Sequence, residues 1–331
     1  MKRQQTFTDI EYANRKRRTK MDEFLDAMDA IIEWPEWCAL VEPYYPLGER
    51  GRPPRGVEIM LRMYLLQNWY NLADEAVEEA IYNTYPMARF MGINFLGDEQ
   101  VPDATTLCKF RQLLDENGVT KKIFETVKGF LEKHGKIMHG GTIVDATIVA
   151  APSSTKNEKH ERDPEMHSVK KGNQWYFGER LHIGTDAGSG YIHSVEVTAA
   201  NASEREVVPE LLREDDEVGY GDGGYIGLEK QESIANHPNF SQIVWRINQR
   251  KPRRATEAWK QGEAARWHKI FNAQKSRVRC KVEYPFLIIK RIFHYNKVQY
   301  RGIQKNRTQA YTLCALANLY MLRQSGFVGT T

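Results

Sequence analysis

The sequence contains little cysteine and no long apolar run. Its 331 residues include four widely separated cysteines, with neither a CxxC pair nor a histidine at zinc-ligand spacing: Cys38, Cys108, Cys280 and Cys314. We expect these cysteines to be buried, reduced side chains rather than disulfides or zinc ligands. No stretch approaches the ~18 to 20 apolar residues of a membrane span, and the first residues lack the apolar segment of a signal peptide. The sequence therefore predicts a cytoplasmic protein with no membrane partner.

Motifs that define several common enzyme classes are also missing. The chain has no Walker P-loop, no glycine-rich dinucleotide fingerprint and no G-x-S-x-G nucleophile elbow. These absences argue against a P-loop nucleotide hydrolase, a Rossmann dehydrogenase and an α/β-hydrolase. The chain is 41% apolar and 11% aromatic, which is enough for a buried core and excludes wholesale disorder.

Positive charge is concentrated in the last quarter of the chain. Residues 246–331 contain 19 basic and three acidic residues and carry +16, although the whole chain carries only +4. Residues 1–245 must then carry 4 − 16 = −12. This distribution indicates a cationic surface in the C-terminal quarter of an otherwise acidic chain.

The first 137 residues predict helices. Apolar residues recur at three- and four-residue intervals over residues 57–69, 71–82, 104–114 and 121–134. We expect an all-helical DNA-binding domain over residues 45–137, in which Lys109 and Arg111 could face DNA from a helix-turn-helix; an ordinary helical bundle has the same pattern. Residues 1–44 are expected to form a basic arm and a helix, whose cluster at residues 15–18 fits either phosphate binding or a solvated helix face.

Residues 138–331 predict an α/β domain. Residues 142–149 are apolar and β-branched without helical periodicity, as in a buried strand. The remaining expected elements are strands at residues 175–185, 191–198, 218–222 and 242–247, and helices at residues 203–212, 228–235, 283–293 and 309–322. A polar excursion is expected at residues 151–173, and a short basic insertion around residues 246–278. Three strands followed by alternating helices and strands are typical of an α/β fold.

Three acidic residues stand out within this domain. Asp145 lies inside an apolar strand, where an unpaired carboxylate is costly to bury. Asp222 ends a second strand among glycines that allow a ligand to approach the backbone, and Glu283 follows the most basic stretch. Three oxygen ligands from different elements suit Mg²⁺ or Mn²⁺, and two such ions would support phosphodiester transfer. By spacing alone, solvated surface acids remain the commoner explanation.

Two basic residues share a predicted helix face with Glu283. At about 100° per residue, Arg279, Glu283 and Lys290 fall within about 40° of one another, so all three could point at one phosphate group. Pro285 disfavours regular helix at this place. Either the helix kinks near Pro285, or it begins near Glu283 and the alignment of Arg279 is fortuitous.

Other acidic residues favour structural roles. Asp186 is expected in a hairpin turn, and Asp215 and Asp216 in an exposed acidic loop. The remaining acids between Glu204 and Glu232 are expected to face solvent.

Several segments together match a known family. They are Gly141–Thr147, Arg162–His167, Lys170–Trp175, Asp222–Tyr225, Arg279–Phe286, Ile289–Arg291 and Tyr300–Gly302. Over nearly its whole length, the chain resembles bacterial insertion-sequence transposases of the DDE class, specifically the insertion-sequence-five group. Residues 51–114 likewise resemble the helical N-terminal domain of these enzymes.

The resemblance implies a ribonuclease-H-like core, a mixed sheet flanked by helices, in which Asp145, Asp222 and Glu283 hold two Mg²⁺ or Mn²⁺ ions. Arg279 and Lys290 match the family's Tyr-x2-Arg-x3-Glu-x6-Lys signature. Residue 276, where that signature has Tyr, is a serine, so no role of the Tyr is carried over.

This resemblance predicts a transposase that cleaves double-stranded DNA at terminal inverted repeats and joins the freed 3′-hydroxyls to target DNA. It implies a homodimer on paired ends, associated with the bacterial nucleoid when bound to DNA. The basic residues expected to contact DNA are Lys170, Lys171, Arg250, Lys251, Arg253, Arg254, Arg291 and Arg301. Two alternatives remain: a metal-dependent nuclease on the same fold, and a non-catalytic DNA-binding protein derived from a transposase.

Overall fold

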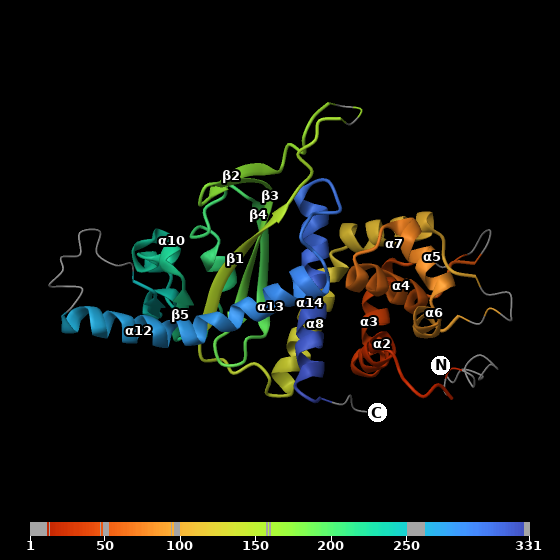
Figure 1. The fold of residues 1–331 in the computed structure, drawn as a ribbon, viewed down its shortest axis with the longest axis horizontal. Coiled ribbons are helices and arrows are strands. Elements are labelled where there is room, and N and C mark those ends of the chain that lie inside the picture. Colours follow the sequence, from red (N-terminus) through yellow and green to blue (C-terminus); the bar gives the residue numbers. More distant parts are fainter. Residues whose placement is uncertain are drawn as a thin grey trace. The chain divides into compact units, whose positions relative to one another are not determined.

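The structure is a computed structural model in which the chain forms two compact units (Figure 1). It describes residues 12, 14–46, 48, 53–93, 95, 100–156, 158, 160–249 and 262–327. The first unit contains the chain up to Lys122 and from Leu319 onward, and the second runs from Ile123 to Asn318. The predicted boundaries near residues 45 and 138 stay a prediction.

The first unit is helical. Its described elements are α2 (Lys20–Ile31), α3 (Trp34–Val41), the 3₁₀ helix η1 (Glu42–Tyr44), α4 (Val57–Tyr70), α5 (Asp74–Asn83), α6 (Tyr85–Met91) and α7 (Ala104–Glu116), and α8 (Val119–Lys133) begins here. Every residue of α4 from Met60 to Trp69 is buried, as expected for a helix surrounded by others. Asp103 caps α7 by accepting a 2.7 Å hydrogen bond from the Thr106 amide, as its position predicted.

Arg111 has a packing role in this unit that the sequence did not predict. Its Nη1 atom lies 2.6 Å from Oδ1 of Asp74 and its Nη2 atom 2.9 Å from Oδ2, so the two side chains form a bidentate pair between α7 and α5. Arg111 and Gln67 hold the pKa of Asp74 below its usual value, against the effect of burial.

The second unit is built on one mixed sheet. Its strands are β1 (Thr142–Ala150), β2 (His167–Lys171), β3 (Gln174–Asp186), β4 (Ile192–Ala199), β5 (Val218–Gly221) and β6 (Val244–Ile247). The strand order is β2-β3-β1-β5-β6, with β4 also paired to β3. The β1–β5 and β5–β6 pairs are parallel, and the pairs that β3 makes are antiparallel.

Helical segments accompany the sheet. They are α9 (Val208–Leu211), η2 (Gly223–Tyr225), η3 (Leu228–Lys230), α10 (Glu232–Ala235), η4 (Phe240–Gln242), α12 (Glu263–Arg279), η5 (Cys280–Val282), α13 (Glu283–Leu287), the π-helix η6 (Ile288–Ile292) and α14 (Ile303–Gln324). The helix predicted over residues 203–212 is largely wrong, because only its last turn, which starts around Pro209, is helical. The polar excursion at residues 151–173 contains the strand β2, which the prediction missed.

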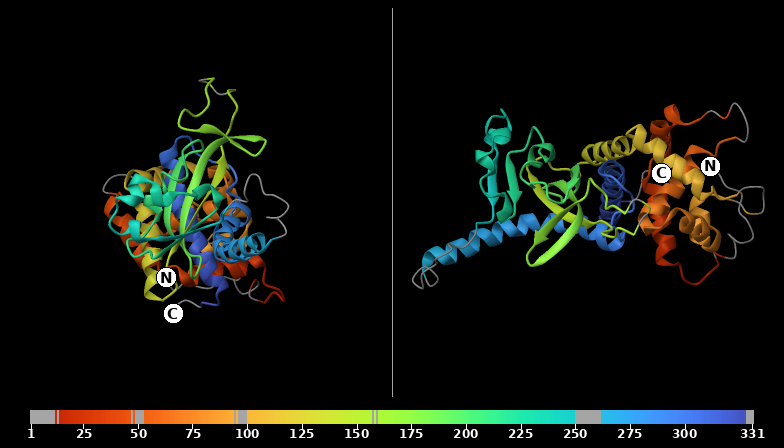
Figure 2. Two further views of the ribbon diagram at one scale, coloured as in Figure 1. Left: turned by 90° about the vertical axis from the view of Figure 1, so that its left-hand side faces the viewer. Right: turned by 90° about the horizontal axis from the view of Figure 1, so that it is seen from above.

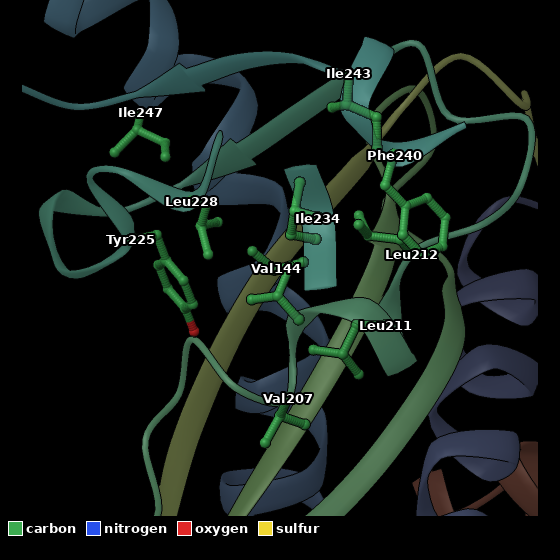
Figure 3. Close-up of a cluster of buried hydrophobic side chains, with 11 residues drawn as sticks. Val144, Val207, Leu211, Leu212, Tyr225, Leu228, Ile234, Phe240, Ile243 and Ile247 are labelled. Carbon is green, nitrogen blue, oxygen red and sulfur yellow. The ribbon is translucent and has the colours of Figure 1, made fainter. Parts of the chain in front are cut away.

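A hydrophobic cluster packs where β1, β5 and β6 meet the short helices (Figure 3). Val144 of β1 contributes from the sheet, and Leu211 and Tyr225 contribute from the segments that cover it. Full burial of one such aliphatic side chain is worth roughly 1.5 to 3 kcal/mol. This cluster therefore fixes the positions of the residues on either side of Val144 and Tyr225.

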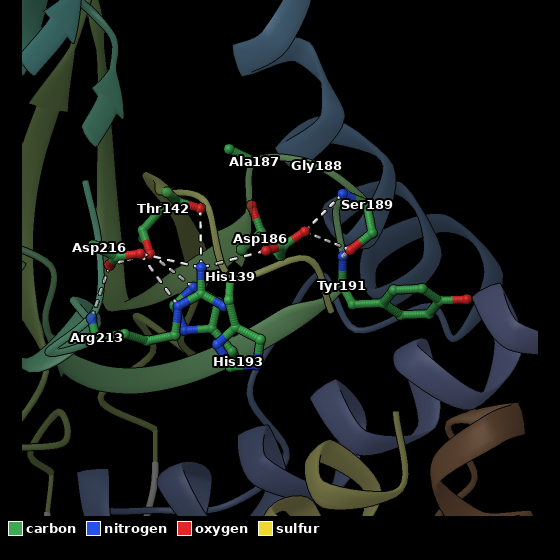
Figure 4. A network of polar contacts seen from close by, with 12 residues as sticks. His139, Thr142, Asp186, Ala187, Gly188, Ser189, Tyr191, His193, Arg213 and Asp216 are labelled. Atoms are coloured by element: carbon green, nitrogen blue, oxygen red, sulfur yellow. Dashed lines mark hydrogen bonds and ion pairs between the residues drawn. The ribbon is translucent and has the colours of Figure 1, made fainter. Parts of the chain in front are cut away.

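A buried polar network secures the start of β1 (Figure 4). Asp186 accepts hydrogen bonds from the amide and hydroxyl of Ser189 at 2.7 and 2.8 Å, which confirms its hairpin-turn role. The Arg213 guanidinium lies 3.3 Å from Asp186 and 3.1 Å from Asp216, and Asp216 also accepts a hydrogen bond from the Thr142 hydroxyl. The predicted exposure of Asp216 is wrong, because its carboxylate is buried among these partners.

The cysteine prediction is confirmed for Cys314, which is buried, and wrong for Cys108 and Cys280, which are exposed. All four described cysteines are free thiols. Among the described helices, none combines the length and apolar character needed to cross a membrane.

Candidate active site

Two acidic residues come from neighbouring parallel strands: Asp145 lies within β1, and Asp222 directly follows the last residue of β5. Thr142 and Ile143 of β1 pair with Gly219 and Tyr220 of β5. The same register places Asp222, the first residue after β5, level with Asp145. The carboxyl ends of parallel strands are a frequent location for ligand sites in α/β sheets.

A hydrogen bond fixes the Asp222 side chain directly after β5. The Oδ1 atom of Asp222 accepts a 2.7 Å hydrogen bond from the Gly224 amide, so that Asp222 caps the 3₁₀ helix η2. The Asp222 side chain remains exposed to solvent. Asp222 is therefore held in place and still accessible to a ligand.

Asp145 is largely buried, and burial raises the pKa of its carboxyl to about 6. Arg279 and the Ala146 amide, which donates a 2.8 Å hydrogen bond, oppose this rise, while the nearby carboxylates of Asp222 and Glu204 add to it. Two neighbouring acids thus repel the charge of Asp145. A cation placed among these oxygens would relieve the repulsion.

Glu283 is linked to Asp145 by the side chain of Arg279. Nη1 of Arg279 lies 3.2 Å from Oδ2 of Asp145, and Nη2 lies 2.8 Å from Oε1 of Glu283. One guanidinium thus joins an acid of β1 to an acid of α13.

The backbone around Pro285 explains how Arg279 and Glu283 stay on one face. Figure 2 shows α12 leading into α13 along a nearly continuous helical path. The 3₁₀ helix η5 at residues 280–282 joins the two helices, and α13 contains Pro285. Of the two possibilities open from the sequence, the second is partly confirmed, because α13 begins at Glu283. The alignment of Arg279 with Glu283 is nevertheless not fortuitous, because η5 continues directly from α12 and Arg279 contacts Glu283.

Lys290 lies in the π-helix η6, an irregularity that is frequent at functional sites. Its Nζ atom donates a 2.5 Å hydrogen bond to the carbonyl oxygen of Ile148, three residues after Asp145 on β1. Burial, with a contribution from Lys171, lowers the pKa of Lys290. The ammonium group is therefore fixed beside the strand that carries Asp145.

The three candidate acids differ in how well they suit a divalent cation. Across the residues that the structure describes, no three His, Cys, Asp or Glu side chains lie close enough to enclose a metal ion. The Glu283 side chain is 61% exposed and is held by Arg279. Asp145 and Asp222 do fit a hard cation, because both supply carboxylate oxygens from neighbouring parallel strands and the charges of Asp222 and Glu204 disfavour the ionised form of Asp145.

The residues expected to contact DNA have different positions. Lys170 and Lys171 are exposed on β2, and Arg291 is exposed directly after Lys290. Arg301 is also exposed, and its guanidinium donates a 3.4 Å hydrogen bond to the carbonyl of Arg162. The other four expected contacts lie outside the described residues: Arg250, Lys251, Arg253 and Arg254. The DNA roles of all eight stay predictions.

Sequence reasoning missed two features near the site. Glu204 was expected to face solvent, but it forms a 3.1 Å ion pair with Arg180 and influences Asp145. Nothing in its sequence neighbourhood distinguishes it from the other acids of that region.

Asp163 and Glu165 accept hydrogen bonds from the amides of Gly302 and Ile303 at 2.7 and 2.8 Å, which anchors the polar excursion to the start of α14. Here the signal is the acidic pair within Arg162–His167.

The mixed sheet flanked by helices has the architecture of a ribonuclease-H-like domain, and comparison with known families agrees. Residues 137–319 match the family model described as the transposase DDE domain, and residues 13–113 match the model described as a transposase domain (DUF772). Because the first match covers more than half of the chain, the chain belongs to the DDE transposase family. No solved structure matches the chain.

Proposed function

We propose that this chain is an insertion-sequence transposase of the insertion-sequence-five group, which cleaves DNA at terminal inverted repeats and joins the 3′-hydroxyl ends to target DNA. The observation that carries the proposal is the position of Asp145 on β1 beside Asp222, which follows the neighbouring parallel strand β5, together with the link from Asp145 through Arg279 to Glu283. Each of these residues comes from a separate element of the sheet or of the helical path.

Divalent ions, when bound, would activate the attacking hydroxyl and stabilise the leaving oxygen of a phosphodiester. Asp145, Asp222 and Glu283 are the proposed holders of two Mg²⁺ or Mn²⁺ ions. In cleavage, water forms a bond to phosphorus and the 3′-oxygen leaves as a hydroxyl. In joining, that 3′-hydroxyl attacks a phosphorus of the target strand and displaces a target 3′-oxygen.

Arg279 and Lys290 have positioning roles in this proposal. Arg279 orients the carboxylates of Asp145 and Glu283, with distances of 3.2 and 2.8 Å. Lys290, which is hydrogen-bonded to the backbone of Ile148, would contact a DNA phosphate from a position seven residues after Glu283 on the same helical path. A bidentate guanidinium fixes direction, whereas a lysine supplies a point charge.

The proposed partner is double-stranded DNA, both the inverted repeats and the target. Pairing of two element ends implies a homodimer, because each end needs one set of acids. Such an enzyme would act at the bacterial nucleoid in the cytoplasm.

The test uses a labelled duplex that carries an element end with its flanking DNA. We expect Mg²⁺-dependent cleavage and joined product with the wild-type chain, and neither with Glu283→Gln, which still binds the duplex. Glu229→Gln, an exposed acid outside the site, serves as the matched control and should retain both reactions.

Two other outcomes would contradict the proposal. Cleavage without joining, even when a precut 3′-hydroxyl end and a target plasmid are supplied, would identify a nuclease. Binding without cleavage in both Mg²⁺ and Mn²⁺ would identify a non-catalytic DNA-binding protein.

A further inference from the structure

The first part of β3 and the whole of β2 form a two-stranded ribbon, residues 167–178. Within it, His167 pairs with Gly178 and Lys171 with Gln174. The pairing of β1 with β3 ends at Gly178, and that of β4 with β3 ends at Glu179. From Gly178 toward its tip, the described ribbon has no further strand beside it and extends past the sheet (Figure 2).

The tip of the ribbon is a tight turn. Gly172 and Asn173 form the two-residue connection, and Gly172 has a φ of 62°, as a glycine at the first position of a hairpin turn requires. This turn fixes the strand register, and with it the side chains that share a face.

The ribbon carries an exposed tryptophan beside a lysine. Trp175 is 67% exposed, more than any other large apolar side chain in the described part of the chain. It pairs directly with Lys170, so the two side chains stand together on one face. Packing within the chain does not account for a ring this exposed.

The charge of the ribbon is entirely positive. Residues 167–178 contain Lys170, Lys171 and His167 and no acidic residue. Lys171 also contributes to lowering the pKa of Lys290. A ribbon with this charge is complementary to a nucleic-acid backbone rather than to a basic or neutral surface.

The strand register sets where such a ligand would lie. Asp145 pairs with Ile183 of β3, and antiparallel partners point to the same face. Trp175 is eight residues from Ile183, an even number, so it also points to the face of Asp145. Eight residues at about 3.3 Å each span roughly 26 Å, and a duplex lying parallel to β3 would pass about eight base pairs, at about 3.4 Å per pair, over that length.

We propose that the β2–β3 ribbon is a DNA-binding element in which Trp175 stacks against a base step about eight base pairs from the scissile phosphate, while Lys170, on the same face, holds an adjacent phosphate. The inference rests on the proposed function for the position of the scissile phosphate. An aromatic ring that opens a base step, with flanking cations on the backbone, combines stacking with electrostatic binding.

The test uses the full-length chain and duplexes with a single 2-aminopurine placed at successive positions from the cleavage point, in Ca²⁺ so that the DNA stays intact. We expect a fluorescence rise confined to a step about eight base pairs away with the wild-type chain and with Trp175→Phe, and its loss with Trp175→Ala. The affinity of Trp175→Ala for the duplex should fall roughly fivefold to hundredfold, the range for loss of one stacked base. Val244→Ala, at another exposed apolar residue of the sheet, is the control and should change neither readout.

Unchanged affinity of Trp175→Ala, or a fluorescence rise that persists in this variant, would overturn the proposal. A change in the oligomeric state of the DNA-free protein with Trp175→Ala would also overturn the proposal, because it would show that the ring contacts a second copy of the chain. Mg²⁺-dependent cleavage measured in parallel separates the two proposals. If the wild-type protein cleaves DNA but gives no fluorescence rise, only the proposed role of the ribbon is rejected. If it gives the fluorescence rise but does not cleave, only the proposed chemistry is rejected.

Discussion

The guanidinium of Arg279 lies 3.2 Å from the carboxylate of Asp145, a residue 134 positions earlier in the chain. Its charge lowers the pKa of this largely buried acid, and its other amino group holds Glu283. Arg279 therefore acts as an internal counter-charge for acids that would otherwise repel one another. The same arrangement keeps Glu283 linked to β1, although its side chain is largely exposed.

Replacing Arg279 with alanine should destabilise the fold in the presence of EDTA. We expect the free energy of unfolding to fall by about 1 to 3 kcal/mol, because the part-buried Asp145 loses its charged partner. Urea denaturation measures this loss, and Arg277→Ala, an exposed arginine of the same helix, is the control. In an Asp145→Asn background the Arg279→Ala change should cost much less; an equal cost in both backgrounds would show that the pair is not coupled.

Replacing Lys290 with alanine should weaken the binding of a cleaved element end and slow cleavage. If the ammonium contacts one phosphate, the slope of log affinity against log salt should become shallower by about one. Filter binding at several salt concentrations gives this slope, with the exposed Lys305→Ala as the control. An unchanged slope would leave Lys290 with only its structural hydrogen bond to Ile148.

The sequence predicted the strands of the core well because their apolar, β-branched residues leave few alternatives. It also singled out Asp145, because a carboxylate inside such a strand is costly to bury unless it is paired or binds a cation. Strand β2 was missed because an edge strand that is largely exposed on both faces has no hydrophobic pattern, whereas its partner β3 was predicted. The role of Arg279 depended on whether Pro285 would break the helix, which local propensity could not decide.

Acids whose partners are distant in the chain were harder to predict. Asp216 resembles a loop residue in the sequence, and its burial depends on Arg213 and on Thr142, which lies 74 positions away. Glu204, which is only part-buried, pairs with Arg180 of β3. In both cases the partner is supplied by the tertiary fold, so short-range patterns contain no signal for it.

Removing Arg213 should be among the most destabilising single changes in the second unit. Its side chain neutralises the carboxylates of both Asp186 and Asp216, which are fully buried. Loss of one partner of a buried ion pair costs about 3 to 5 kcal/mol, so Arg213→Ala should denature at much lower urea concentration. Arg266→Ala, at an exposed arginine of α12, is the control. Equal urea midpoints for Arg213→Ala and the wild type would contradict a charge-neutralising role.

The same network should make stability depend on acidic pH through Asp186. Hydrogen bonds from Ser189 and the charge of Arg213 hold its pKa below the usual value in the folded state, although burial acts in the opposite direction. The unfolded chain therefore binds a proton first as the pH falls. The contribution of Asp186 is present above about pH 4 and is lost below it. The difference in unfolding free energy between the wild type and Asp186→Asn should shrink from pH 7 to pH 3, and a constant difference would refute this assignment.

Glu179 should have the opposite pH dependence. Burial raises the pKa of its carboxyl to about 8, against the effect of a 3.1 Å hydrogen bond from the Tyr295 hydroxyl. The folded chain therefore keeps this proton between about pH 4.5 and pH 8, where the unfolded chain has lost it, so stability falls as the pH rises through that window. The loss should approach roughly 1.4 kcal/mol per pH unit.

Glu179→Gln, which is neutral at every pH, should remove this slope and be more stable than the wild type near pH 8. Urea denaturation from pH 5 to pH 9 measures both curves, with the exposed Glu229→Gln as the control. Parallel curves for the wild type and Glu179→Gln would mean that Glu179 is already ionised in the folded chain.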